Sequence, residues 1–197
     1  MPEKGISIEK VKAILEGKSN FSINSTEELN KCIEHISSLI SDAYILYKNN
    51  SFTSSAFLSI AIIEEVGKVH MGMYIKSSDS YIKKDKLRDH MSKQIVGANY
   101  TISMSDRILK AISTEKFEEI FELAYSGKLK ELREKAIYCD RENSQIKIPR
   151  DIISQEFSRN ILLFAIESFD DNLVGYTSYS IKESKKTDLL FNKIAKS

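Results

Sequence analysis

The sequence predicts an all-α fold, a helical bundle of about five main helices with short extra helices. Only two prolines, Pro2 and Pro149, occur in the 197 residues, so long helices are permitted almost everywhere. Apolar residues recur at alternating steps of three and four, which is the helical period. No repeat, low-complexity tract or linker divides the chain. We therefore expect one domain over residues 1–197, with a basic C-terminal tail at about 176–197.

Helix caps and apolar periodicity predict the helices in the first half of the chain. Ser25 begins a capping box with Glu28, and a regular apolar seam follows it. The next helix is apolar nearly all round, which places it inside the bundle. The predicted helices cover about 7–16, 25–48, 53–76 and, after a polar connection at 77–85, a third long helix over 87–113.

Glycines end two helices in the second half, Gly127 and Gly175. Residues 138–149 have no helical period and predict a loop or a small hairpin. The predicted helices cover about 114–126, a short stretch through 129–136, 154–175 and a last segment over 188–196.

The most apolar stretch, Ala56 to Met73, carries Glu64, Glu65 and Lys68 at its centre. Burial of charge costs several kcal/mol per ion unless partners neutralise it, so the cluster requires a reason. A simple helix ion pair between Glu64 and Lys68 is the alternative, although it leaves Glu65 unexplained. The charges also exclude a membrane span here.

With 29 basic and 28 acidic residues, the overall charge predicts no partner. Locally, a basic patch surrounds His90 and is a candidate for binding RNA or phosphate, the alternative being solvated lysines on an exposed turn. We interpret the other two histidines, His35 and His70, as interface or core residues. The patch consists of Lys83, Lys84, Lys86, Arg88 and Lys93.

The common chemical motifs are absent from the sequence: it has no Gly-rich phosphate loop, no zinc-type spacing and no nucleophile elbow. Bundle di-iron sites use Glu-x-x-His, but Lys68 stands where Glu65 would require the histidine. We expect no metal and no cofactor. Cys32 and Cys139 form no motif, and without a signal peptide or spanning helix we expect a cytoplasmic protein with free thiols and no membrane contact.

Three segments together resemble the AbiV-type abortive infection proteins of the HEPN superfamily. The first is the apolar helix that ends in Glu-Glu-Val-Gly-Lys at residues 64–68. The second is Asp89-His90-Met91-Ser92-Lys93-Gln94, similar to the family's His-x-x-Lys segment. The third is Leu-Arg-x-x-x-x-Tyr-x-Asp at residues 132–140, with the later Pro149. The resemblance implies a HEPN-type helical bundle, a role in bacterial phage defence and a phage protein as trigger.

HEPN ribonucleases usually carry Arg-x(4–6)-His, which this chain lacks. The nearest match is Arg133 followed by Tyr138, and tyrosine is a poor base at neutral pH. If the protein cleaves RNA without a metal, the expected roles are His90 as acid or base and Lys93 and Arg133 as phosphate-binding groups. Tyr138 belongs to the same candidate site. The supporting buried cluster is Glu64, Glu65 and Lys68.

Two functions therefore remain open. One is an effector that arrests the infected cell by RNA degradation or by shut-off of translation. The other is a non-catalytic helical module that occupies a host or phage protein. We also predict a homodimer, because the central helix is apolar on every side and the helix over 25–48 adds a stripe of Cys32, Leu39 and Leu46. In a monomer, the last helix would instead fold back over that stripe.

Overall fold

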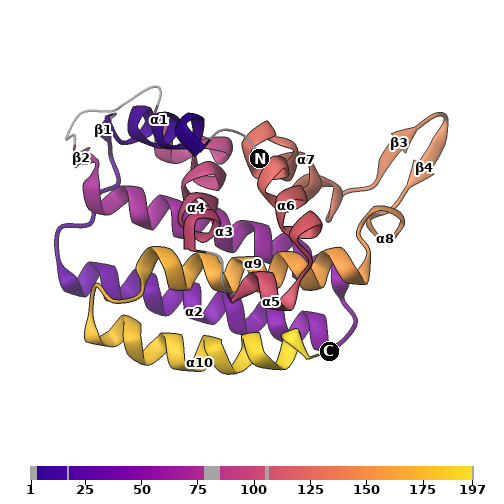
Figure 1. Cartoon of the computed structure of the whole chain (residues 1–197). Helices are drawn as coiled ribbons and strands as arrows, with labels where there is room; N and C mark the ends of the chain where they lie inside the picture. Colours follow the sequence, from indigo (N-terminus) through magenta and orange to yellow (C-terminus); the bar gives the residue numbers. More distant parts are fainter. Residues whose placement is uncertain (1–3, 17, 78–84, 105–106, 197) are drawn as a thin grey trace.

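The all-α fold is confirmed by the structure, a computed structural model that describes residues 4–16, 18–77, 85–104 and 107–196. Four long helices pack together as a bundle, and most of the shorter helices lie above it in Figure 1. The bundle consists of α2 (Thr26–Lys48), α3 (Phe52–Tyr74), α9 (Gln155–Leu173) and α10 (Ser178–Ala195), in which α2 and α9 contact each other and both of the other two. The shorter elements are α1 (Lys4–Leu15), η1 (Lys86–Arg88), α4 (His90–Met104), α5 (Ile108–Ala111), α6 (Thr114–Ser126) and α7 (Lys128–Lys135).

Helix α3 is the centre of the core, as its all-round apolar sequence predicts. It packs against α2, α4 and α9, and its apolar side chains Ile60, Ile62 and Ile63 have no exposed surface. The predicted cap of α2 is also present, because Ser25 Oγ accepts the backbone N–H of Glu28 at 3.2 Å. Neighbouring helices of the same chain therefore bury the central helix.

The predicted continuous helix over 87–113 is wrong. The structure has η1, α4 and α5 in its place, and α5 runs in a different direction from α4 (Figure 1). Arg107, just before α5, donates from Nε to Glu167 Oε2 on α9 at 2.7 Å and also pairs with Asp188 on α10. These contacts, together with the fully buried Ile108, fix α5 against the bundle of long helices.

The last helix begins ten residues earlier than the predicted 188, at Ser178. Thr177 caps it, accepting the backbone N–H of Ser180 at 2.9 Å. The helix folds back over α2 and α9 and buries Phe191 and Ile194. Much of the segment predicted as a basic tail is thus part of the core.

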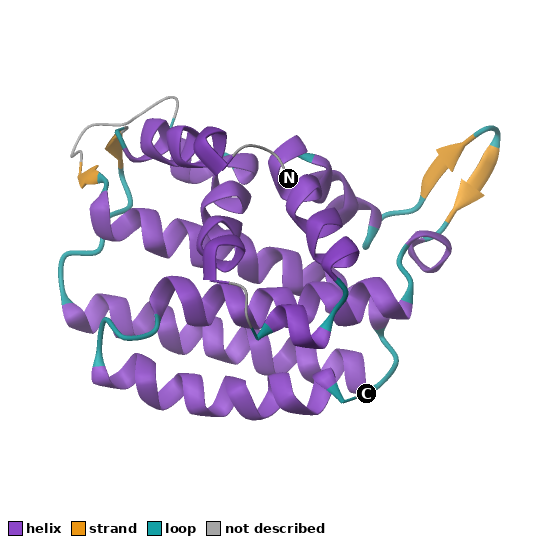
Figure 2. Ribbon diagram, viewed as in Figure 1, coloured by secondary structure: helices purple, strands orange, loops and turns teal. Residues whose placement is uncertain are grey.

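Residues 138–149 contain the small hairpin that was one of the two predicted alternatives. Strand β3 (Asp140–Glu142) pairs antiparallel with β4 (Gln145–Lys147), and Asn143 and Ser144 supply the positive φ angles of a two-residue turn. The hairpin projects from the body just before α8 (Pro149–Ile152), as Figure 2 shows in orange. A second short sheet joins β1 (Lys18–Ser19) to β2 (Lys76–Ser77) in parallel.

Among the described helices, none has the length and apolar character needed to cross a membrane.

Candidate functional site

The carboxylate of Glu64 is the centre of a polar network inside the bundle. Glu64 lies on α3 and is 4% exposed. Its Oε2 accepts from His90 Nδ1 at 2.8 Å and from Arg133 Nη1 at 3.2 Å, while its Oε1 accepts from Gln94 Nε2 at 2.8 Å. Three elements therefore meet at one side chain: α3, α4 and α7. We call these four residues the Glu64 network.

Two glycines allow α3 and α4 to approach closely enough for this network. A Cβ atom at Gly67 would overlap the carbonyl oxygen of Lys93, and one at Gly97 would overlap the carbonyl oxygen of Ile63. The helices therefore touch backbone to backbone at this crossing. The Gly of the Glu-Glu-Val-Gly-Lys segment thus has a structural role, which is to bring Glu64 within reach of side chains on α4.

The network determines the orientation and the tautomer of His90. A carboxylate that accepts hydrogen bonds from Arg133 and Gln94 is ionised, so the shared contact requires a proton on Nδ1 of His90. Nε2 is then the nitrogen left for chemistry, and the His90 side chain is 33% exposed. Asp89 fixes the start of α4, because its Oδ2 accepts the backbone N–H of Ser92 at 2.9 Å.

Two cationic side chains lie beside this carboxylate. Arg133 is 20% exposed, and its buried Nε has no hydrogen-bond partner among the described residues. Lys93 is buried, and its amine forms no ion pair with any side chain in the described part of the chain. Burial lowers the pKa of Lys93, and the nearby carboxylates of Glu64 and Glu65 only partly oppose this shift.

Glu65 and Lys68, the other two charges of the predicted buried cluster, pair with each other at 2.9 Å. Their side chains are 25% and 28% exposed, so only Glu64 of the three charges is buried. The alternative ion pair between Glu64 and Lys68 is wrong. Lys68 also lies over the ring of Phe21, 4.6 Å from its centroid, and this contact ties the pair to the N-terminal segment.

Tyr138 does not join the network. It is 67% exposed at the base of the hairpin, and no hydrogen bond connects it with Glu64, His90 or Arg133. Of the predicted basic patch, Arg88 lies exposed in η1, which leads into α4, and Lys86 belongs to the same element. Lys83 and Lys84 lie outside the described residues.

Gln94 and Asp89 are site residues that were not predicted from the sequence. Gln94 lies four residues after His90, so both side chains project from the same face of α4, and this spacing was the available signal. The other histidines follow the interpretation in part. His70 is a core residue, bound through Nδ1 to the carbonyl of Asn172 at 3.1 Å, whereas His35 is exposed on α2.

The residues of the Glu64 network lie in the part of the chain that matches a known protein family. The family model HEPN_AbiV, described as AbiV, matches residues 24–169, a range that contains all four network residues and excludes α1 and α10. The searches of curated proteins and of solved structures returned no match. Because the family match covers well over half of the sequence, the chain belongs to the AbiV family of HEPN proteins.

Proposed function

We propose that this protein is an abortive-infection effector of the bacterial cytoplasm, which arrests the infected cell by cleaving RNA once a phage component triggers it. Membership of the AbiV family supports the defence role. The observation that carries the chemistry is the double contact of Glu64 Oε2, which holds His90 Nδ1 and Arg133 Nη1 together.

The proposed reaction is metal-independent transesterification of an RNA phosphodiester. His90 Nε2 takes the proton of the ribose 2′-hydroxyl, and the oxygen attacks the adjacent phosphorus. The bond from phosphorus to the 5′-oxygen breaks, and the leaving oxygen takes a proton from the Lys93 ammonium. The products are a 2′,3′-cyclic phosphate and a 5′-hydroxyl, after which solvent takes the extra proton from His90 and returns one to Lys93.

Each role is supported by a physical property of the residue. Glu64 stabilises the imidazolium that forms on His90, as a buried carboxylate does in other His-based sites. The lowered pKa of Lys93 makes its ammonium a better acid near neutral pH. Arg133 supplies positive charge for the phosphoryl oxygens, and its side chain is 20% exposed.

Occupancy of a host or phage protein is the second candidate. The burial of Gln94 Oε1 and Arg133 Nε favours it, because a phosphodiester reaches neither atom unless the site opens. In this alternative the Glu64 network only stabilises the fold.

The decisive variant is His90→Ala, with His35→Ala as its control because His35 is exposed and lies outside the network. We expect His90→Ala to fold, to lose phage protection and to leave cellular RNA intact, whereas His35→Ala keeps both activities. The measurements are plaquing efficiency and RNA integrity in the same infected cultures, with end-group analysis of the cleaved RNA.

Full protection by a stably expressed His90→Ala variant would remove His90 from the site. Protection by the wild type without any RNA cleavage would instead favour occupancy.

A further inference from the structure

Helix α10, which the structure describes over its full length, carries cations and no acidic side chain on its outer face. Successive residues of a helix point about 100° apart, so their positions around α10 follow from the sequence. A set of exposed residues falls within an arc of about 100° on the side away from the core. These residues, which we call the lysine stripe, are Lys182, Lys185, Lys186, Leu189, Lys193 and Lys196, the last directly following the helix.

Both acidic residues of α10 point away from the centre of this stripe. Glu183 is 4% exposed and accepts from Ser37 Oγ on α2 at 2.8 Å and from Lys186 Nζ at 2.7 Å. Lys186 nevertheless keeps 62% of its side chain exposed. Asp188 pairs with Arg107, just before α5. The negative charges of the helix are therefore neutralised by contacts within the fold, whereas its positive charges face solvent.

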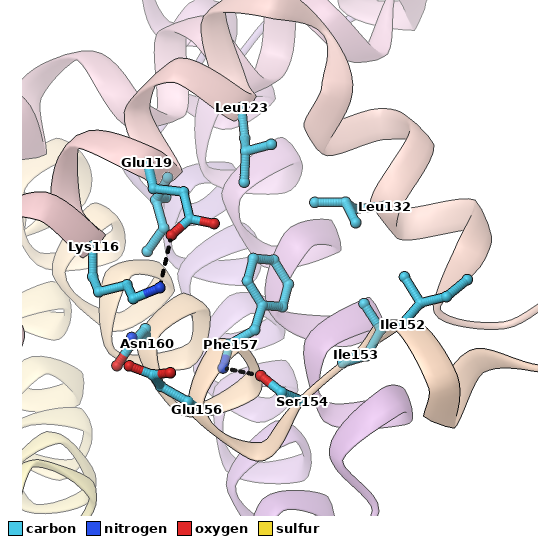
Figure 3. A pocket seen from close by; sticks show the side chains of 11 residues that line it. Lys116, Glu119, Leu123, Leu132, Ile152, Ile153, Ser154, Glu156, Phe157 and Asn160 are labelled. Atoms are coloured by element: carbon cyan, nitrogen blue, oxygen red, sulfur yellow. Dashed lines mark hydrogen bonds and ion pairs between the residues drawn. The ribbon is translucent and has the colours of Figure 1, made fainter.

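Two other parts of the described surface mix the two signs of charge. On the rim of the hollow between α6 and α9, Lys116 pairs with Glu119 at 3.1 Å, and Glu156 lies on the same rim (Figure 3). On α2, Lys31 pairs with Glu27 at 3.0 Å. The whole chain is nearly neutral, with 29 basic and 28 acidic residues. The lysine stripe is therefore a local concentration of positive charge and does not simply reflect the composition.

The lysine stripe is straight and lies at the edge of the molecule. At 1.5 Å per residue, Lys182 and Lys196 are about 21 Å apart along the helix axis. In Figure 1, α10 runs along one side of the bundle, and α1, α4, α6 and α7 lie on the opposite side. The stripe can therefore meet a flat surface over its whole length, while the Glu64 network stays on the far side of the bundle.

We propose that the lysine stripe docks α10 on an anionic lipid surface, with Leu189 inserted among the head groups. The cytoplasmic leaflet of a membrane has a negative surface potential, which attracts each lysine that comes near it. The long lysine side chains can bring their ammonium groups to the lipid phosphates while their methylene groups lie against apolar surface. Leu189 is 62% exposed at the centre of the arc, where an aliphatic side chain can enter the boundary of the acyl chains.

The residue types of the stripe favour lipid over RNA as its partner. Proteins that bind single-stranded RNA combine a cationic groove with aromatic side chains, on which the bases stack. The lysine stripe contains no aromatic residue, and it follows a convex helix face instead of a groove. Its apolar member is Leu189, and an aliphatic anchor among lysines is typical of helices that bind at a membrane surface.

This docking does not depend on RNA cleavage by the Glu64 network. The family match ends at residue 169, so the stripe also lies outside the matched range. The expectation of no membrane contact was based on the sequence lacking a spanning segment. Adsorption onto a lipid surface requires no such segment.

The test is flotation of the full chain with lipid vesicles. The wild type should float with vesicles of phosphatidylglycerol and phosphatidylcholine, be released by high salt and stay unbound with phosphatidylcholine alone. The double variant Lys182→Glu/Lys185→Glu should weaken binding at least about 25-fold, because one lysine near an anionic surface changes the affinity about fivefold. Neither lysine forms an ion pair among the described residues, so we expect the variant to fold, which thermal melting checks.

The matched control is Lys128→Glu/Lys130→Glu, which makes the same change in net charge at exposed positions of α7. It should weaken vesicle binding far less, because α7 lies on the opposite side of the bundle (Figure 1). Equal losses in the two double variants would overturn the proposal, since the attraction would then depend only on net charge.

A second pair of variants tests the insertion of the apolar side chain. Leu189→Ser should weaken vesicle binding, whereas Ile146→Ser should not, because Ile146 is 56% exposed on the distant hairpin. Equal binding by these two variants would reject lipid as the partner. A wild type that fails to float with anionic vesicles would overturn the proposal as well. If that protein instead binds a single-stranded RNA oligonucleotide through the lysine stripe, the partner is RNA.

Discussion

At the scale of single residues, burial separates two adjacent glutamates. Glu64 is 4% exposed and binds three donors, whereas the side chain of Glu65 is 25% exposed and pairs with Lys68. The two side chains point about 100° apart on one helix, so only one of them enters the core. They provide a matched pair for testing which charge the fold requires.

We predict that Glu64→Gln lowers the free energy of unfolding by about 3 kcal/mol, because it leaves the cation of Arg133 without its partner. This value is at the low end for a buried pair, since the side chain of Arg133 is 20% exposed. Glu65→Gln should cost less than about 1 kcal/mol, as expected for a partly exposed pair. Urea denaturation of both variants measures the difference, and equal losses would contradict the distinction.

The sequence was sufficient to select most residues of the site but not their pairing. Glu64, His90 and Arg133 were predicted site residues, and the structure brings all three together. The alternative pairing of Lys68 with Glu64 is wrong, because helical spacing alone does not distinguish a neighbour at three residues from one at four. The contact with Arg133 joins residues 69 positions apart, and no local pattern fixes such a distance.

At the scale of elements, the crossing of α3 and α4 holds the site together. Gly67 and Gly97 permit contact between the two backbones, and Glu64 and His90 come from the helices that cross there. Any side chain at the contact would separate the helices. The geometry of the network is thus fixed by backbone contact as well as by its hydrogen bonds.

Gly67→Ala provides a test in which helix propensity and packing predict opposite changes in the stability of the protein. Propensity alone would stabilise the helix by about 1 kcal/mol. The overlap with the Lys93 carbonyl should instead destabilise the protein by about 1–3 kcal/mol and weaken phage protection. In the control, Gly72→Ala, the new methyl meets the side chains of Phe21 and Ile23 and no backbone atom, so the neighbours can shift and the loss should be smaller. Melting temperatures and plaquing efficiency measure both effects.

Helices with a clear cap and a regular apolar period were predicted well. The errors lie where contacts between distant parts of the chain determine the helix boundaries. The cap at Ser25 and the period after it fixed α2 to within one residue. The break before α5 depends on the ion pairs of Arg107 with α9 and α10, which the sequence does not reveal. The early start of α10 depends on the cap at Thr177. The apolar periodicity that follows Thr177 is weak, so the sequence does not mark this residue clearly as a helix start.

At the scale of the whole molecule, Asp171 on α9 makes the stability of the fold depend on pH. Its charge interacts with that of Arg107, which contacts both α9 and α10. Burial raises the pKa of Asp171 to about 7, and the charges of Glu167 and Asp170 add to the shift. Its buried Oδ2 has no hydrogen-bond partner among the described residues. The pKa values of Glu167 and Asp170 are also raised by burial.

A raised acid pKa means that the folded state binds this proton more strongly than the unfolded state. Asp171 therefore makes stability fall as pH rises from about 4 to about 7. We predict that Asp171→Asn removes this contribution, so that the gain in stability over the wild type grows with pH and levels off above pH 7. Chemical denaturation from pH 5 to pH 8 measures it. A gain in stability for Asp171→Asn that stays constant from pH 5 to pH 8 would contradict the prediction.

The packing of α10 on α2 also has a consequence for folding during synthesis. Because the ribosome makes α2 long before α10, the helix that covers α2 with Phe191 and Ile194 emerges much later than α2 does. The nascent chain thus keeps an apolar face of α2 open until α10 has been made. A protein proposed to arrest its own cell completes its core only after α10 has left the ribosome.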